Sequence, residues 1–195
     1  CLLSAEYDAT SQSDYFACAN VWHMLHDWSA VRRCLRQAHD LANKTREILH
    51  CFDHWRTLDE TNITDASACL TEAEMNAEDV NDYVQCARAW QQLDDGERED
   101  RCLAKARSYA AQAEAEGKNA EAMIEAAWAW SKLAETRKVR QCADRAEYLG
   151  NVNGMTTEKW FNLAVIRDEL DDNGRAYQCR RQGETLALAH CTRCD

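Results

Sequence analysis

The apolar side chains of this chain recur at spacings of three and four residues, with polar side chains between them. One such set begins near the start of the chain and contains Tyr15, Cys18, Ala19, Trp22 and Leu25. Because an α-helix turns once in about 3.6 residues, these side chains lie on one face of an amphipathic helix. A second set of the same kind follows a short polar turn and contains Val31, Cys34, Leu35 and Ala38. The pattern therefore predicts two helices joined by a turn.

The same helix–turn–helix pattern repeats along the whole chain. The second helix of each unit carries a cysteine at a matching position, at intervals of 33 to 40 residues: Cys1, Cys34, Cys69, Cys102, Cys142 and Cys179. The first helix carries a tryptophan at a matching position, except in the last unit, which has an arginine: Trp22, Trp55, Trp90, Trp130 and Arg167. Repeats of this period indicate stacked helical hairpins, because one hairpin cannot bury its apolar face alone.

These repeats predict an all-α fold, an α-solenoid of antiparallel helix–turn–helix units that forms one segment over residues 1–195. The chain has no Pro and only 6 Gly, so few residues interrupt a helix. We assign the end of a preceding repeat and then five repeats, with the bounds 1–9, 13–43, 45–77, 79–116, 119–150 and 156–190. The match over residues 1–9 leads us to expect that the sequence is a fragment of a longer chain. The fifth repeat departs from the pattern at Arg167, Arg180 and Gly183.

The stretch ANVWHMLHDWSAVRRCLRQAHDLA, residues 19–42, resembles one unit of the tetratricopeptide repeat family. The small residue Ala19, the aromatic Trp22, the turn residue Asp27 and the closing Ala38 carry the likeness. The Pro that usually follows the second helix in that family is absent from every repeat. The resemblance implies a TPR-like superhelix that acts as a scaffold for protein binding and not as an enzyme.

Net charge bears on the kind of partner, and the cysteine positions bear on the cellular location. Lys and Arg number 23 against 34 Asp and Glu, so the formal net charge is −11. Phosphate binding needs clustered cations, so this balance argues against direct binding of nucleic acid or anionic membranes. No apolar run reaches the roughly 18 residues of a membrane-spanning helix. Most of the 11 Cys occupy repeat positions, which indicates buried, reduced packing thiols and a cytoplasmic location.

The candidate binding surface lies on the first helix of each repeat. In tetratricopeptide-like repeats, the residues beside the buried stripe of this helix line an inner groove. The resemblance therefore implies a partner-binding groove that contains Asn20, His23, Asp53, Arg56, Arg88, Gln91, Trp128 and Lys132. Its cations stand out in an acidic chain and favour an acidic or polar protein or peptide partner. The indole of Trp128 offers an apolar anchor.

The sequence leaves two other functions open. One is a regulatory or sensor role within a larger enzyme, for example a caspase-like peptidase or a kinase, whose catalytic domain lies outside this segment. The other is a metal or redox role, because HMLH (23–26), HCFDH (50–54) and CTRC (191–194) have spacings that metal sites use. HCFDH lacks the Glu of a zinc protease motif, and CTRC lacks a second pair. We therefore expect no catalytic residues, no metal and no cofactor.

Overall fold

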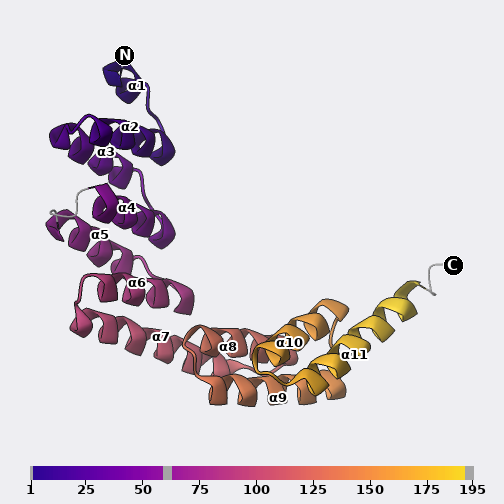
Figure 1. Ribbon diagram of the computed structural model, residues 1–195. Coiled ribbons are helices and arrows are strands. Elements are labelled where there is room, and N and C mark those ends of the chain that lie inside the picture. Colours follow the sequence, from indigo (N-terminus) through magenta and orange to yellow (C-terminus); the bar gives the residue numbers. More distant parts are fainter. Residues whose placement is uncertain (1, 59–62, 192–195) are drawn as a thin grey trace. The chain divides into compact units, whose positions relative to one another are not determined.

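The computed structural model describes residues 2–58 and 63–191, and the regular structure of these residues is entirely helical. Eleven helices follow one another through this described part (Figure 1). Their bounds are α1 (Leu2–Tyr7), α2 (Gln12–Met24), α3 (Trp28–Asp40), α4 (Thr45–Leu58), α5 (Ile63–Met75), α6 (Val80–Gln92), α7 (Gly96–Glu116), α8 (Ala120–Lys132), α9 (Thr136–Asn153), α10 (Thr157–Glu169) and α11 (Asn173–Cys191). The chain forms two compact units, unit 1 (residues 1–103) and unit 2 (residues 104–195), with the boundary inside α7.

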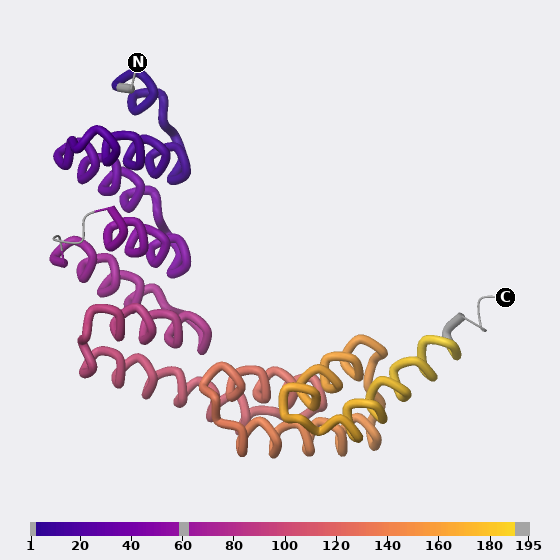
Figure 2. The backbone as a smooth tube through the Cα atoms, in the orientation of Figure 1, coloured from indigo at the N-terminus to yellow at the C-terminus, as the bar shows by residue number. Residues whose placement is uncertain are grey.

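The helices of unit 1 pack as hairpins. Helix α2 packs along α3, and α4 packs along α5. Successive hairpins meet through α3 against α4 and α5 against α6, while α2 contacts α4 and α4 contacts α6. Figure 2 shows this succession in the indigo and purple part of the tube. We call the first helix of each repeat the A helix (α2, α4, α6, α8 and α10) and the second the B helix (α3, α5, α7, α9 and α11).

The apolar stripe of the sequence forms the core of unit 1. The indoles of Trp55 and Trp90 are each 1% exposed. Small buried side chains near them let the helices approach closely, among them Ala19, Ala66, Ala73 and Ala87. The cysteines of both helices are buried as well, so the thiols fill space between the hairpins as small apolar groups.

In unit 2, α8 packs along α9, α10 packs along α11, and α10 also contacts both α8 and α9. Gly183 of α11 lies against the ring of Phe161 on α10. A methyl group at Gly183 would come within 3.3 Å of two ring carbons. The earlier repeats have alanine at this position, so in the last repeat the phenyl ring occupies the space of the missing methyl group.

Four of the turns between A and B helices share one backbone conformation. The residue after the last leucine of the A helix has a φ of 55° to 57° in each case: His26, Asp94, Ala134 and Asp171. The following N–H donates back to the carbonyl oxygen of the repeat tryptophan, as from Asp95 to Trp90 at 3.2 Å and from Glu135 to Trp130 at 3.1 Å. This is the Schellman arrangement that ends a helix.

Four of the five A helices, α2, α6, α8 and α10, begin at a side chain that caps them. Ser11, Asp79, Asn119 and Thr156 each accept a hydrogen bond from the backbone N–H three residues later. Ser11 forms a reciprocal capping box with Asp14. Such caps satisfy backbone donors that have no partner inside the helix. In these four hairpins, local chemistry therefore sets where the A helix begins and where it ends.

The structure confirms the prediction of an all-α chain built from neighbouring helix pairs. It does not show the superhelical geometry of tetratricopeptide repeats, which stays a prediction. None of the described helices combines the length and the low polarity required to cross a bilayer.

Candidate functional site

The A helices α4 and α6 of unit 1 expose two facing rows of polar side chains. The row on α4 consists of Arg46, His50, Asp53 and Arg56, and the row on α6 consists of Asn81, Gln85, Arg88 and Gln92. Within each row the spacing is three or four residues, which places the side chains along one side of the helix. We call the space between the rows the α4–α6 groove.

Three hollows that share lining residues make up this groove. The first has a volume of about 500 Å³, lies towards the start of both helices and includes Gln12 of α2. It shares Leu49, Asp53 and Gln85 with a second hollow of about 240 Å³. The second shares Gln92 with a third, of about 460 Å³, which Arg56 also lines. Leu49, Phe52 and Ala89 are buried and line the second hollow, so the groove has an apolar floor between polar walls.

The arginines of the α4–α6 groove differ from the other arginines of unit 1. Arg33, Arg36, Arg98 and Arg101 each form an ion pair with a carboxylate of the same unit. Arg46, Arg56 and Arg88 are exposed, and no ion pair or hydrogen bond joins their guanidinium groups to the residues that the structure describes. Their N–H donors are therefore available to carboxylates of another molecule.

A cluster of three rings borders the groove between α2 and α4. The ring of His54 stacks on Phe16 with centroids 3.9 Å apart, and the ring of His50 lies 4.9 Å from both. Burial and the neighbouring His50 hold the pKa of His54 below its ordinary value, so its imidazole is neutral at pH 7. A neutral ring can stack on the phenyl group without bringing charge to the apolar side of the groove.

The structure places the predicted groove residues in different surroundings. Asp53, Arg56 and Arg88 line the α4–α6 groove. Gln91 is exposed on α6, but the adjacent Gln92 is the residue that lines the groove. The other four predicted residues lie on helices outside the groove: Asn20 and His23 on α2, and Trp128 and Lys132 on α8.

On α2, the predicted residues are occupied within their own unit. The side-chain amide of Asn20 donates to the carbonyl oxygen of Phe16 at 2.9 Å. The ring of His23 meets the edge of Trp28 with centroids 5.1 Å apart. In unit 2, Trp128 is half-buried and Lys132 is exposed.

Sequence reasoning missed Asn81 and Gln85, two of the three amide side chains of the α6 row. They precede Arg88 by seven and three residues, so the helical period that identified Arg88 could have found them. Both are half-buried and both border the hollow at Arg88.

No metal-binding geometry is present among the described residues, where no three His, Cys, Asp or Glu side chains lie close enough to share an ion. The rings of His50 and His54 are neighbours but lack a third ligand. The prediction about CTRC concerns Cys194, which lies outside the described residues. Burial raises the pKa of Cys34 and Cys51 to about 12, so these thiols stay protonated at neutral pH.

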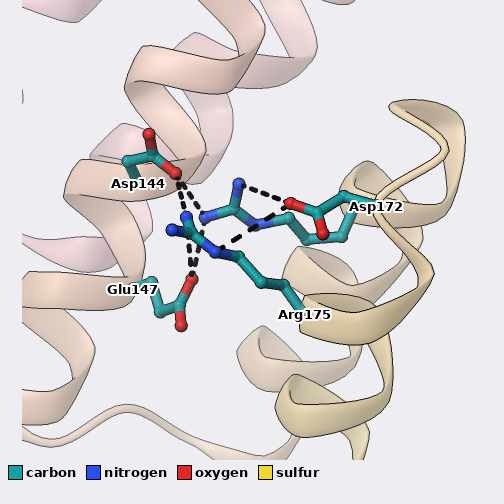
Figure 3. Close-up of polar contacts among 5 residues, drawn as sticks. Asp144, Glu147, Asp172 and Arg175 are labelled. Carbon is teal, nitrogen blue, oxygen red and sulfur yellow. Dashed lines mark hydrogen bonds and ion pairs between the residues drawn. The ribbon is translucent and has the colours of Figure 1, made fainter.

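A cluster of charged side chains lies in unit 2 around Arg167, and Figure 3 labels four of its members, Asp144, Glu147, Asp172 and Arg175. The side chain of Arg167 is 0% exposed. Its Nη2 lies 2.8 Å from both Asp144 Oδ1 and Glu147 Oε2 of α9, and its Nη1 lies 3.6 Å from Asp172 Oδ2. Arg175 of α11 reaches Asp144 at 2.5 Å. The guanidinium group of Arg167 therefore fills the position that tryptophan occupies in the earlier repeats.

Comparison with models of known protein families finds no match, and comparison with curated proteins finds no significantly similar sequence. The chemistry of the groove therefore has to carry the functional argument.

Proposed function

We propose that this chain is a tetratricopeptide-like solenoid that serves as a protein-binding scaffold. Three observations support the assignment: the helix pairs, the repeat of 33 to 40 residues, and the unit-like stretch of residues 19–42. In this proposal the α4–α6 groove holds a segment of a partner protein. The buried, protonated thiols of both units support a reducing location such as the cytoplasm.

The unpaired arginines of the groove carry the proposal. Three guanidinium groups border a groove with an apolar floor, where the carboxylates of Glu47, Asp53 and Asp94 also lie. Four other arginines of the unit form ion pairs with nearby carboxylates: Arg33, Arg36, Arg98 and Arg101. An exposed cation that lacks an internal partner loses little by pairing with a carboxylate of another chain. An acidic or polar segment is therefore the occupant that this groove fits best.

The amide side chains of α6 add a preference for extended backbone. Asn and Gln offer a donor and an acceptor, as a peptide group does. The row from Asn81 to Gln92 spans about 16 Å at ~1.5 Å per residue. That length corresponds to roughly five residues of extended chain. The proposed occupant is thus a short extended segment with one or more carboxylates.

Chemistry at the groove supports a scaffold without enzymatic activity. Its described residues include no hydroxyl or thiol nucleophile held by a histidine base. Thr57 Oγ1 donates to the carbonyl oxygen of Asp53 within its own helix. The groove residues offer recognition by charge, amide and apolar contact.

The decisive experiment is affinity capture from the native host with this chain as bait. The variant Arg56→Glu with Arg88→Glu reverses two groove charges, and Lys44→Glu with Lys118→Glu is a control with the same change in net charge at exposed lysines. We expect a partner that binds the wild type and the control, and that loses at least roughly tenfold in affinity with the groove variant. Titration calorimetry with the identified partner measures the loss. A partner that binds all three baits equally would refute the groove assignment.

A further inference from the structure

The B helix α9 of unit 2 carries more positive charge than its surroundings neutralise. It contains four cations and two carboxylates: Arg137, Lys138, Arg140, Arg145, Asp144 and Glu147. Lys138 pairs with Glu114 at 3.0 Å. Arg167 and Arg175 hold both carboxylates (Figure 3). The remaining three arginines are exposed and form no ion pair or hydrogen bond with the described part of the chain.

These three arginines share the solvent-facing side of α9. An α-helix turns by ~100° per residue, so Arg140 lies about 60° from Arg137 around the helix axis in one direction. Arg145 lies about 80° from Arg137 in the other direction. Tyr148 lies about 20° from Arg137 and is 67% exposed, and Val152 is 62% exposed. The opposite side of the helix is buried and consists of Val139, Cys142, Ala143 and Ala146. The exposed side is thus a strip of about 22 Å that combines three unpaired cations with two apolar groups.

We propose that this strip, the α9 strip of Arg137, Arg140, Arg145, Tyr148 and Val152, docks an acidic segment of a partner protein. Guanidinium groups bind carboxylates through two parallel hydrogen bonds. The ring of Tyr148 and the side chain of Val152 add apolar contact area at one end of the strip. The complementary segment carries several carboxylates followed by an aromatic or aliphatic side chain.

Charge distribution favours an acidic protein segment over a nucleic acid. Unit 1 contains 9 Lys and Arg against 20 Asp and Glu, whereas unit 2 contains 14 of each. A nucleic acid carries a phosphate roughly every 3.4 Å along each strand, so it extends its charge well beyond three arginines. The acid-rich unit on the same chain repels such a polyanion. A short peptide matches the local excess of charge and carries fewer negative charges, so it is repelled less.

The α9 strip is a different surface from the α4–α6 groove of the proposed function. The α4–α6 groove lies on A helices of unit 1, and the α9 strip lies on a B helix of unit 2. Either surface can therefore be tested while the other is kept intact.

Fluorescence anisotropy with the full chain tests the proposal. The probe is a fluorescein-labelled peptide of about twelve residues, rich in Glu and ending in Phe, at low salt where ion pairs are weakly screened. The test variant is Arg137→Glu, Arg140→Glu and Arg145→Glu. The control triple, Lys44→Glu, Lys118→Glu and Arg181→Glu, makes the same change in net charge at exposed cations that form no ion pair with the described residues. We expect binding to weaken roughly tenfold or more in the test variant, and less than about twofold in the control and in Arg56→Glu with Arg88→Glu.

Circular dichroism checks the helical content of each variant. If the Arg→Glu test variant fails to fold, the corresponding Arg→Gln triple is used in its place. Equal weakening in both triples, or no peptide binding to the wild type, overturns the proposal. Weakening confined to the groove variant assigns the peptide to the α4–α6 groove, which refutes the α9 strip and leaves the proposed function standing. Tighter binding of a short DNA duplex, abolished by the test variant, would make the strip a nucleic-acid surface. A dimer of the wild type that the test variant dissociates would make the occupant a second copy.

Discussion

Helices α6 and α10 present different residues at the same position of the repeat, and both are buried. Trp90 of α6 is 1% exposed, and Arg167 of α10 is 0% exposed. Each of them has an arginine of the following B helix as a neighbour. In both repeats this arginine precedes the B-helix cysteine by four residues. The guanidinium of Arg98 lies 4.3 Å from the centre of the Trp90 ring. In the last repeat, Arg175 shares the carboxylate of Asp144 with Arg167.

The comparison shows what this position requires, which is a large flat group that reaches back to the preceding B helix. The indole N–H of Trp22 donates to Glu6 at 3.2 Å, and that of Trp130 donates to Glu114 at 3.1 Å. Arg167 makes the equivalent contact with Glu147. In each case the carboxylate belongs to the preceding helix, so the group joins neighbouring repeats through a polar contact as well as by packing. A guanidinium satisfies the same geometry at the cost of a buried charge.

Removal of Arg167 is expected to give the largest effect. Arg167→Ala leaves a cavity and removes the main partner of two carboxylates, so we expect a loss of about 3–5 kcal/mol in the free energy of unfolding. Trp90→Ala is expected to lose a similar ~3–5 kcal/mol by loss of packing alone. Urea denaturation measures both. The two losses differ in cause, because only Arg167→Ala leaves carboxylates without their buried cation. Arg88→Glu is the control, with a change below about 0.5 kcal/mol, and an equal loss in all three variants would contradict the assigned helix faces.

The next largest expected effect is the pH dependence of the stability that Glu6 contributes to the fold. Hydrogen bonds from Arg33 and Trp22 hold the pKa of Glu6 below its ordinary value of 4.5, against the opposing effect of burial. A lowered pKa in the folded state means that the contact stabilises the fold above about pH 4.5 and is lost as pH falls through the lower folded value. We expect Glu6→Gln to cost about 1–2 kcal/mol at pH 7 and little near pH 3. Denaturation curves at both pH values measure this, and a cost independent of pH would contradict it.

Substitution of tryptophan by phenylalanine measures what the indole hydrogen bond contributes to stability in different repeats. Trp130 donates a hydrogen bond to Glu114, whereas the indole N–H of Trp90 is buried and has no hydrogen-bond partner among the described residues. Glu74, which lies on the preceding B helix, binds Arg101 through both of its oxygens. We therefore expect Trp130→Phe to cost about 1 kcal/mol more than Trp90→Phe. Thermal melts of the two variants give the difference, and equal costs would show that the indole hydrogen bond adds nothing.

The smallest expected effect concerns the turn after Trp130. Ala134 has a φ of 56°, a conformation that a Cβ atom disfavours and that glycine adopts freely. Ala134→Gly is expected to stabilise unit 2 by about 0.5–1 kcal/mol. The matched change Asp94→Gly should help less, because Asp tolerates this region better than Ala. Calorimetry can rank the two, and a destabilised Ala134→Gly would show that the turn carries no strain.

Helical pairing could be predicted from the sequence because it depends on local spacing. Tyr15, Cys18, Ala19 and Trp22 share a face in any α-helix, whatever packs against it. The same logic places Asp53, Arg56 and Arg88 beside the buried stripe of their helices, and all three line the groove. Their role in binding stays a prediction.

Burial of Arg167 could not be predicted by that logic. Its neutralising carboxylates lie 20 and 23 residues earlier on α9 and five residues later in the turn. Only the packing of α10 between α9 and α11 brings them together, and no periodicity within one helix reports it. The division into two units within α7 likewise depends on contacts between helices.

The buried guanidinium of Arg167 also bears on the order in which the last two hairpins assemble. A charge with 0% exposure is stable only when its carboxylates are in place, and those come from α9 and from the turn that leads into α11. The hairpin of α10 and α11 therefore gains little by forming before α9 has docked. Most solenoid interfaces let repeats fray one at a time from an end. Here the hairpin of α10 and α11 is thermodynamically coupled to the hairpin of α8 and α9, so the two should unfold in one cooperative step.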